Sequence, residues 1–192
     1  MNLPNKLTIF RIIMVPVFLF LLCVPLPISD TAVRIITAAV FALTSLTDMI
    51  DGKIARKYNL ITDFGKFMDP LADKFLVISA MLGIIVRFDY IRPVFVWAAA
   101  IVIFREFAVT SLRLVAASKS GLVIAAAWLG KVKTTSQMIC IVTILLEPLI
   151  PFAPFTEWHI LSYITTAVMA FMTLWSGLDY LKKYSPYIGT TK

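Results

Sequence analysis

The sequence has few acidic residues, few cysteines and no polar stretch long enough to fold as a separate soluble domain. Only 11 of its 192 residues are Asp or Glu, and it holds one histidine. Hydrophobic residues make up 60% of the chain, against roughly 45–50% in ordinary soluble domains. Both cysteines, Cys23 and Cys140, lie in apolar runs, so packing is their expected role and a structural disulfide is not expected. The composition excludes an ordinary soluble fold and predicts one membrane domain over residues 1–192.

Several apolar runs are long enough to cross a bilayer, which takes about 20 residues of helix. We expect an all-α, polytopic membrane protein whose six transmembrane helices form one bundle. These spans are expected at residues 7–26, 31–50, 67–86, 92–114, 132–150 and 159–180. Links that contain proline separate several of them. Residues 115–130 are weakly amphipathic and rich in small side chains, and we expect either a surface-lying connector or an extension of a span.

The basic residues are distributed unequally between the two sides that this topology defines. Six spans place both termini on one side, and only Arg34, Arg87 and Arg92 of the 18 Lys and Arg residues fall on the other. Basic residues gather on the cytoplasmic side of membrane proteins, so both termini are expected there. The net charge of +7 then indicates contact with anionic lipid headgroups. A nucleic-acid partner is not expected, because the basic residues flank apolar spans and form no soluble patch.

The scarce aspartates are concentrated in one short segment. Asp48 and Asp51 lie three residues apart at the end of the second span, and Asp69 and Asp73 lie four apart at the start of the third. Residues at these spacings share a helix face, so two helices joined by a short turn can present four carboxylates to one another. Such charges are costly near a membrane unless cations compensate them. The pattern predicts a site for Mg²⁺ or Mn²⁺, with two ions expected, and metal-assisted phosphoryl chemistry.

Small residues and one arginine stand between these aspartates. Gly52 follows the second aspartate directly, Gly65 lies one helical turn before the third, and Ala55 is also small. Arg56 offers a planar guanidinium suited to phosphate. We interpret the segment as a pocket for a diphosphate with a flat base nearby. The alternative, that each aspartate is a helix cap or a solvated charge, explains one position better than four at facing spacings. A fifth aspartate, Asp63, is expected to be a cap or turn residue.

The complete spacing resembles the signature of the CDP-alcohol phosphatidyltransferase family. It reads Asp48-x2-Asp51-Gly52-x2-Ala55-Arg56-x8-Gly65-x3-Asp69-x3-Asp73. The resemblance implies a six-helix membrane enzyme, usually a dimer, that joins an alcohol to the phosphatidyl group of a CDP-linked lipid and releases CMP. It implies that the metal ligands are Asp48, Asp51, Asp69 and Asp73, with Asp73 also the general base. It implies that the CDP site is lined by Gly52, Ala55, Arg56 and Gly65.

Two further segments bear on the alcohol acceptor. The opening stretch LPNKLTIFRI, and residues 105–117 together with 130–138, resemble bacterial family members that use glycerol 3-phosphate. An acceptor that carries a phosphate needs cations beyond the metals. Four basic residues at the ends of the fourth and fifth spans are candidates for that role: Arg105, Arg113, Lys131 and Lys133. The general bias of basic residues toward the cytoplasmic side is the alternative explanation.

Some of these residues have a structural alternative of their own. Arg105 is adjacent to Glu106, and the two are candidates for a structural ion pair. Thr134 and Gln137 lie one helical turn apart and are candidates either for the acceptor site or for hydrogen bonds between helices. The single histidine, His159, falls on the outer side, and no catalytic role is expected for it.

The expected partners are therefore CDP-diacylglycerol, glycerol 3-phosphate, membrane lipids and a second copy of the chain, in the bacterial cell membrane. A related synthase that uses inositol phosphate, serine or phosphatidylglycerol as acceptor is the main alternative. A cation transporter is the alternative from another class of protein. It would place acidic residues near the bilayer midplane on broken, repeated helices. Here the acids lie at one membrane face and no internal repeat is apparent, which favours the enzyme.

Overall fold

The computed structural model describes residues 2–57, 62–120 and 128–188, and those residues form helices and short connections without strands. The elements are α1 (Leu3–Cys23), α2 (Asp30–Lys57), α3 (Asp63–Arg87), α4 (Arg92–Ser120), α5 (Trp128–Leu146), the 3₁₀-helix η1 (Glu147–Leu149), α6 (Ala153–Trp158) and α7 (Ile160–Ile188). The predicted all-α class is confirmed. The fourth span continues to Ser120, so part of the expected connector extends that helix.

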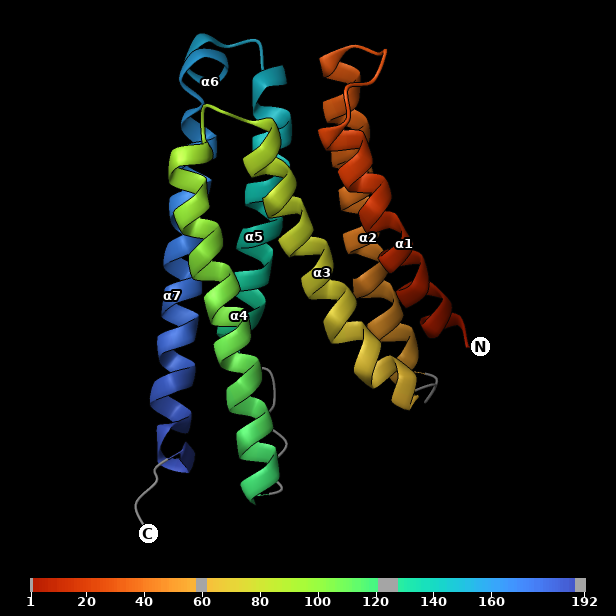
Figure 1. Ribbon diagram of the computed structural model, residues 1–192, viewed down its shortest axis with the longest axis vertical. Helices are drawn as coiled ribbons and strands as arrows, with labels where there is room; N and C mark the ends of the chain where they lie inside the picture. Colours follow the sequence, from red (N-terminus) through yellow and green to blue (C-terminus); the bar gives the residue numbers. More distant parts are fainter. Residues whose placement is uncertain (1, 58–61, 121–127, 189–192) are drawn as a thin grey trace.

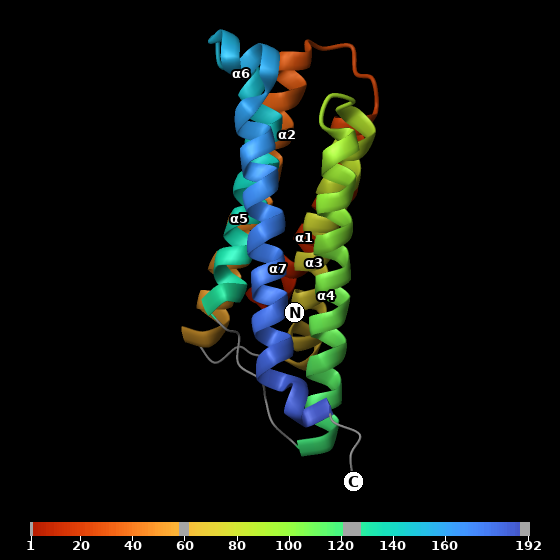
Figure 2. The same cartoon turned by 90° about the vertical axis from the view of Figure 1, so that its left-hand side faces the viewer.

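The long helices run side by side along one axis (Figure 1). Helix α1 packs against α2 and α3, while α4 and α5 both pack against α7. Helix α3 joins the two groups because it also contacts α4 and α5, and α2 contacts α5. The first turn of α1, the start of α3 and the last turns of α2, α4 and α7 all lie toward the lower end of the bundle (Figures 1 and 2). The predicted aspartate segment, which joins α2 to α3, is therefore at that end.

The core is a continuous apolar cluster that runs through the bundle. Phe18 of α1 and Phe41 of α2 are buried, and their ring centroids are 5.7 Å apart. Gly83 lets α1 approach α3 closely, because an added Cβ would lie only 2.7 Å from the Cδ2 atom of Leu22. Burial of such side chains, at roughly 25 cal/mol per Å² of apolar surface removed from solvent, fixes the relative positions of the helices that carry the site.

Five of the described segments are long and apolar enough to cross a membrane. They are Leu3–Cys23, Asp30–Thr47, Arg92–Val115, Trp128–Leu149 and Ile160–Tyr184. Large apolar side chains such as Trp97 and Phe104 are more than two-thirds exposed on the outside of the bundle, as expected for surfaces that contact lipid. Helix α3 is not among the five, because its first half carries charged residues. The chain is a multi-pass membrane protein, but the prediction of six spans is not confirmed.

The upper end of the bundle is closed by polar contacts between helix ends. Asp30, at the start of α2, accepts hydrogen bonds from Arg34 and Arg87, each at 2.6 Å. Glu147 is buried, and its carboxylate accepts hydrogen bonds from the backbone N–H groups of Leu161 and Ser162 at 2.7 Å. The hydrogen bonds to Glu147 satisfy backbone donors at the first turn of α7, which would otherwise lack partners. They hold helix ends that lie far from the aspartate segment.

Candidate active site

The start of α3 is fastened to the start of α1. Thr62 caps α3, and its side-chain oxygen accepts a hydrogen bond from the backbone N–H of Gly65 at 3.0 Å. The same hydroxyl donates to Asn5 Oδ1 of α1 at 2.9 Å. A threonine cap of this kind satisfies a backbone donor that has no partner within the helix. The cap thus sets both where α3 begins and how it meets α1.

Asp69 lies one turn further along α3 and also contacts α1. Its Oδ1 atom accepts a hydrogen bond from the hydroxyl of Thr8, which is fully buried. Beside it, a Cβ added at Gly65 would lie 3.2 Å from Thr62 Oγ1, 3.3 Å from Asn5 Oδ1 and 3.6 Å from Asp69 Oδ2. The absence of a side chain at Gly65 therefore keeps the space beside the second oxygen of Asp69 open.

Part of the predicted metal site lies outside the described side chains. Helix α2 continues to Lys57, so Asp48 and Asp51 are three residues apart on one helix. The side chains of residues 48–57 are outside the described part of the structure, and this range includes the predicted CDP-site residues Gly52, Ala55 and Arg56. Within the described part, no group of three or more His, Cys, Asp or Glu side chains could hold a metal ion.

The described carboxylates nevertheless have the chemistry of a divalent-cation site. Asp69 and Asp73 are four residues apart on α3 and so lie on one face of it. Carboxylate oxygens are the ligands that Mg²⁺ and Mn²⁺ prefer. The space that Gly65 leaves beside Asp69 Oδ2 is compatible with a further ligand at that oxygen. The residues present therefore fit the implied metal.

A small cavity of about 20 Å³ lies where α3, α4 and α5 meet. Its polar lining residues are Asp73, Lys74, Glu106, Lys133, Thr134 and Gln137, and its apolar ones are Val77, Ile78 and Val102. The structure thus brings the predicted base, Asp73, together with one predicted phosphate ligand, Lys133. It also includes Thr134 and Gln137, the two polar residues of α5 for which the sequence left two roles open.

Glu106 contacts two of the basic residues that were predicted to bind the acceptor phosphate. Lys133 Nζ donates a hydrogen bond to Glu106 Oε1, and Arg105 Nη1 lies 3.2 Å from the same oxygen. The side chains of Glu106 and Lys133 are 12% and 7% exposed, so this pair is shielded from solvent. The predicted contact between Arg105 and Glu106 is present, but Lys133 shares the carboxylate. A largely shielded carboxylate with two cationic partners thus holds Lys133 at the wall of the cavity.

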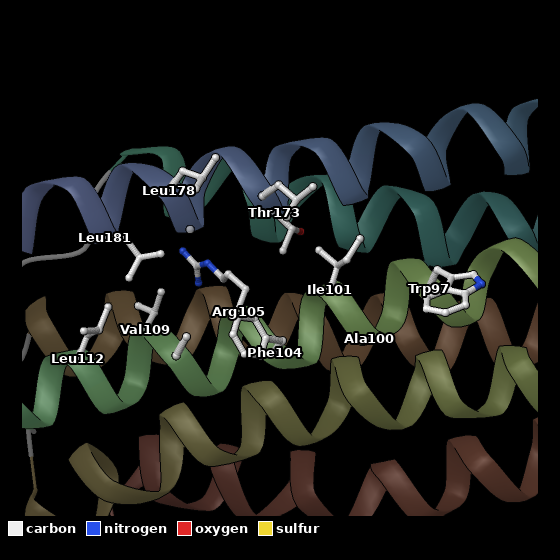
Figure 3. Close-up of a pocket in the computed structure, with 13 residues that line it drawn as sticks. Trp97, Ala100, Ile101, Phe104, Arg105, Val109, Leu112, Thr173, Leu178 and Leu181 are labelled. Atoms are coloured by element: carbon white, nitrogen blue, oxygen red, sulfur yellow. The ribbon is translucent and has the colours of Figure 1, made fainter. Parts of the chain in front are cut away.

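The other predicted phosphate ligands lie elsewhere. Arg105 Nη2 donates to Ser176 Oγ, and Arg113 Nη2 donates to the hydroxyl of Tyr180, both at 2.6 Å. Figure 3 shows the Arg105 side chain between α4 and α7, in a groove with apolar walls. Lys131 is exposed at the start of α5. The four candidates are therefore divided, with Lys133 beside Asp73 and the two arginines on the face of α4 that meets α7.

Three site-adjacent residues were missed by sequence reasoning: Asn5, Thr8 and Glu106. Asn5 and Thr8 stand inside the opening stretch LPNKLTIFRI, where the resemblance to family members implies no role for either residue. Both are polar and buried near the start of an apolar helix, which is the signal that could have identified them. The sequence pairs Glu106 only with its neighbour Arg105, because its contact with Lys133 of α5 depends on how the helices pack.

Comparison with known proteins identifies one matching family and relatives whose names agree with it. Residues 1–175 match the CDP-alcohol phosphatidyltransferase family. The chain is 43% identical to a Bacillus subtilis protein named CDP-diacylglycerol–glycerol-3-phosphate 3-phosphatidyltransferase, over 95% of this chain and 94% of the relative. An Escherichia coli protein of the same name is 37% identical, over 94% and 93%. A Mycobacterium tuberculosis protein named probable phosphatidylglycerophosphate synthase is 36% identical, over 98% and 84%.

Proposed function

The chain belongs to the CDP-alcohol phosphatidyltransferase family, and we propose that it transfers the phosphatidyl group of CDP-diacylglycerol to glycerol 3-phosphate. The products are phosphatidylglycerophosphate and CMP, so the enzyme serves anionic phospholipid biosynthesis. Relatives that are similar over most of both chains carry the name of this reaction. The structural observation that supports it best is the cavity that Asp73 and Lys133 share, because it pairs a proton acceptor with a cation for an anionic substrate.

The diphosphate end of the lipid substrate binds at the aspartate segment. The proposed metal ligands are Asp48, Asp51, Asp69 and Asp73, and the proposed CDP-site residues are Gly52, Ala55, Arg56 and Gly65. Two Mg²⁺ or Mn²⁺ ions bound there would offset the charge of the diphosphate and of the leaving CMP. Thr8 orients Asp69 through its hydrogen bond, and Gly65 keeps the neighbouring space open.

Asp73 acts as the general base in a direct displacement. Its carboxylate accepts the proton from the 1-hydroxyl of glycerol 3-phosphate, and the resulting oxygen attacks the lipid-side phosphorus. The bond from that phosphorus to the CMP oxygen breaks, so CMP leaves with the electron pair. Lys133, held by Glu106 at the wall of the same cavity, stabilises the anionic acceptor. Arg105, Arg113 and Lys131 are proposed to draw the acceptor phosphate toward the site, as basic surfaces do for anions.

The membrane arrangement follows from the same proposal. Residues 1–192 form one domain, a homodimer in the bacterial cell membrane, with both termini and the active site on the cytoplasmic side. The grouping of basic residues at the helix ends that neighbour the aspartate segment supports this orientation. Acyl chains then remain in the bilayer, while CMP and glycerol phosphate exchange with water.

The direct test uses purified enzyme, CDP-diacylglycerol and a panel of acceptors: glycerol 3-phosphate, inositol phosphate, serine and phosphatidylglycerol. We expect CMP release and a new lipid with glycerol 3-phosphate only. Activity should need Mg²⁺ or Mn²⁺, disappear in excess chelator and return when the metal is restored. CMP release with another acceptor instead would assign the chain to a sister synthase, and full turnover in excess chelator would contradict the metal role of the aspartates.

A further inference from the structure

Gln137 is a buried polar residue whose side-chain amide nitrogen lacks a hydrogen-bond partner among the described residues. It lies on α5, is 1% exposed and lines the cavity that also holds Asp73. Its Nε2 atom has no hydrogen-bond partner within the described part of the protein. Leaving a buried amide N–H without a partner is destabilising, so such a group in a native protein calls for an explanation. A ligand that supplies an acceptor oxygen is one such explanation.

The size of the cavity limits that ligand. A volume of about 20 Å³ accommodates one polar group of the size of a water molecule. Several other polar groups in its lining are already engaged. Lys133 contacts Glu106, Lys74 Nζ donates to Thr110 Oγ1 at 2.5 Å, and Thr134 Oγ1 donates to the carbonyl oxygen of Gly130 at 3.0 Å. The Gln137 amide is therefore well placed to bind a hydroxyl that enters the cavity.

We propose that Gln137 determines acceptor specificity by binding the secondary hydroxyl, on C2, of glycerol 3-phosphate; this rests on the proposed function. In that function Asp73 takes the proton from the 1-hydroxyl, and the C2 hydroxyl is on the adjacent carbon. Asp73 and Gln137 line one cavity from two helices, so the C2 hydroxyl can enter the cavity while the 1-hydroxyl, on the adjacent carbon, contacts Asp73. An amide both donates and accepts, as a hydroxyl does, so the two groups are complementary.

The experiment compares two acceptors on the same enzyme preparation. The probe is 3-hydroxypropyl phosphate, which keeps the primary hydroxyl and the phosphate but lacks the C2 hydroxyl. For the wild type, kcat/KM should favour glycerol 3-phosphate over this analogue by roughly 10- to 100-fold, the effect of a buried hydrogen bond that is made or lost. Gln137→Met, which has a similar shape without an amide, should reduce that ratio to near one, mainly by lowering kcat/KM for glycerol 3-phosphate.

The matched control is Thr135→Val on the same helix. Thr135 is exposed, its hydroxyl bonds the Lys131 carbonyl oxygen, and it does not line the cavity, so the ratio should not change. The ratio of the two kcat/KM values does not depend on the fraction of enzyme that is folded. If Gln137→Met cannot be prepared, Gln137→Asn, which withdraws the amide by one methylene, takes its place. Equal loss with both acceptors, or an unchanged ratio, would overturn the proposal. A wild type inactive with glycerol 3-phosphate but active with another acceptor would instead overturn the proposed function.

Discussion

Two glutamates, Glu106 and Glu147, are shielded within the same bundle, but their surroundings differ in kind. Glu147 lies near the upper end, and its oxygens accept hydrogen bonds from the backbone of Leu161 and from the backbone and side chain of Ser162. Glu106 lies on α4 between two cations, Arg105 and Lys133, at the wall of a cavity. One carboxylate is enclosed by fixed backbone donors, while the other is held by side chains beside an open space.

The difference indicates what each carboxylate can do. Donors on a helix backbone cannot move without unwinding that helix, so the role of Glu147 is to fix the first turn of α7. Lysine and arginine side chains can reorient, and each carries a charge that an anionic substrate can share. Burial alone therefore does not identify a functional carboxylate in a membrane protein. Partners that can exchange, next to a cavity, are the better criterion.

The largest effect is expected for Asp73, the other carboxylate that lines the cavity with Glu106. Asp73→Asn keeps the size and one oxygen of the side chain but cannot accept the proton from the acceptor hydroxyl. Loss of a positioned base typically costs about 10²- to 10⁴-fold in rate. We expect turnover, measured as CMP release, to fall by at least about 100-fold. Binding of CDP-diacylglycerol in the presence of metal should persist.

Asp48→Asn provides the contrast for that experiment. It changes a proposed metal ligand that is not the proposed base, so it should weaken binding of metal and CDP-diacylglycerol as well as turnover. If Asp73→Asn retained more than roughly a tenth of wild-type turnover, another group would have to be the base.

The next largest effect tests the two glutamates directly. In Glu147→Gln one backbone donor of α7 loses its partner, which should lower the free energy of unfolding by about 1–3 kcal/mol. The kinetic constants of the folded enzyme should be unchanged.

In Glu106→Gln the buried Lys133 loses its counter-charge, so stability should also fall. In this variant, however, KM for glycerol 3-phosphate should change, while KM for CDP-diacylglycerol should not. Thermal unfolding and acceptor titrations separate the two outcomes. An unchanged acceptor KM in Glu106→Gln would place both glutamates in the same structural role.

The local features of this site could be predicted from sequence, whereas its long-range contacts could not. The spacing of Asp69 and Asp73 defines a shared face on any helix, and α3 has that face. The hydrogen bond from Thr8 to Asp69 joins residues 61 positions apart, so no local pattern encodes it. The N-terminal helix also begins at Leu3, earlier than expected, because a proline at its first turn suits a helix start although the stretch looks polar.

The basic residues illustrate the same limit. The sequence groups four basic residues because they lie at the ends of neighbouring spans: Arg105, Arg113, Lys131 and Lys133. On α4, however, positions 105 and 113 are eight residues apart and share a face, which turns toward α7. Glu106 is seven residues before Arg113 and therefore lies nearly in line with it along the helix, yet it contacts Lys133 of α5. Helical periodicity alone does not separate the arginines from Glu106, and only the packing of α4 between α3 and α7 shows which of these side chains meets the cavity.

A smaller effect is expected from the basic residues themselves. Lys133→Ala removes a cation from the cavity wall, and we expect KM for glycerol 3-phosphate to rise about tenfold, as for one lost hydrogen bond to a charged group. Arg113→Ala removes a cation that contacts Tyr180 of α7 and does not line the cavity, so its effect on the same KM should be only a few-fold. KM for CDP-diacylglycerol should stay constant in both. A larger effect for Arg113→Ala would mean that the acceptor phosphate binds toward α7.

The smallest effects are expected from substitutions at two glycines, Gly65 and Gly130, whose surroundings differ. At Gly65 an added Cβ would press on Thr62 Oγ1 and Asn5 Oδ1, at 3.2 and 3.3 Å, and would lie 3.6 Å from Asp69 Oδ2. At Gly130, near the start of α5, an added Cβ would meet nothing within 4 Å. Alanine is favoured over glycine within a helix by roughly 0.5–1 kcal/mol. Gly130→Ala should therefore stabilise the protein slightly and leave its kinetics unchanged.

In Gly65→Ala the same gain is offset, because the threonine and asparagine side chains must move by a few tenths of an ångström. Stability should then change little, while KM for CDP-diacylglycerol rises a few-fold, since the new methyl group narrows the space beside Asp69. The measurement is CMP release against CDP-diacylglycerol concentration at saturating metal and acceptor, alongside thermal unfolding of both variants. A Gly65→Ala enzyme that bound CDP-diacylglycerol as well as Gly130→Ala does would show that the lipid diphosphate does not use the space beside Asp69. The position of Gly65 would then reflect only the packing of α3 against α1.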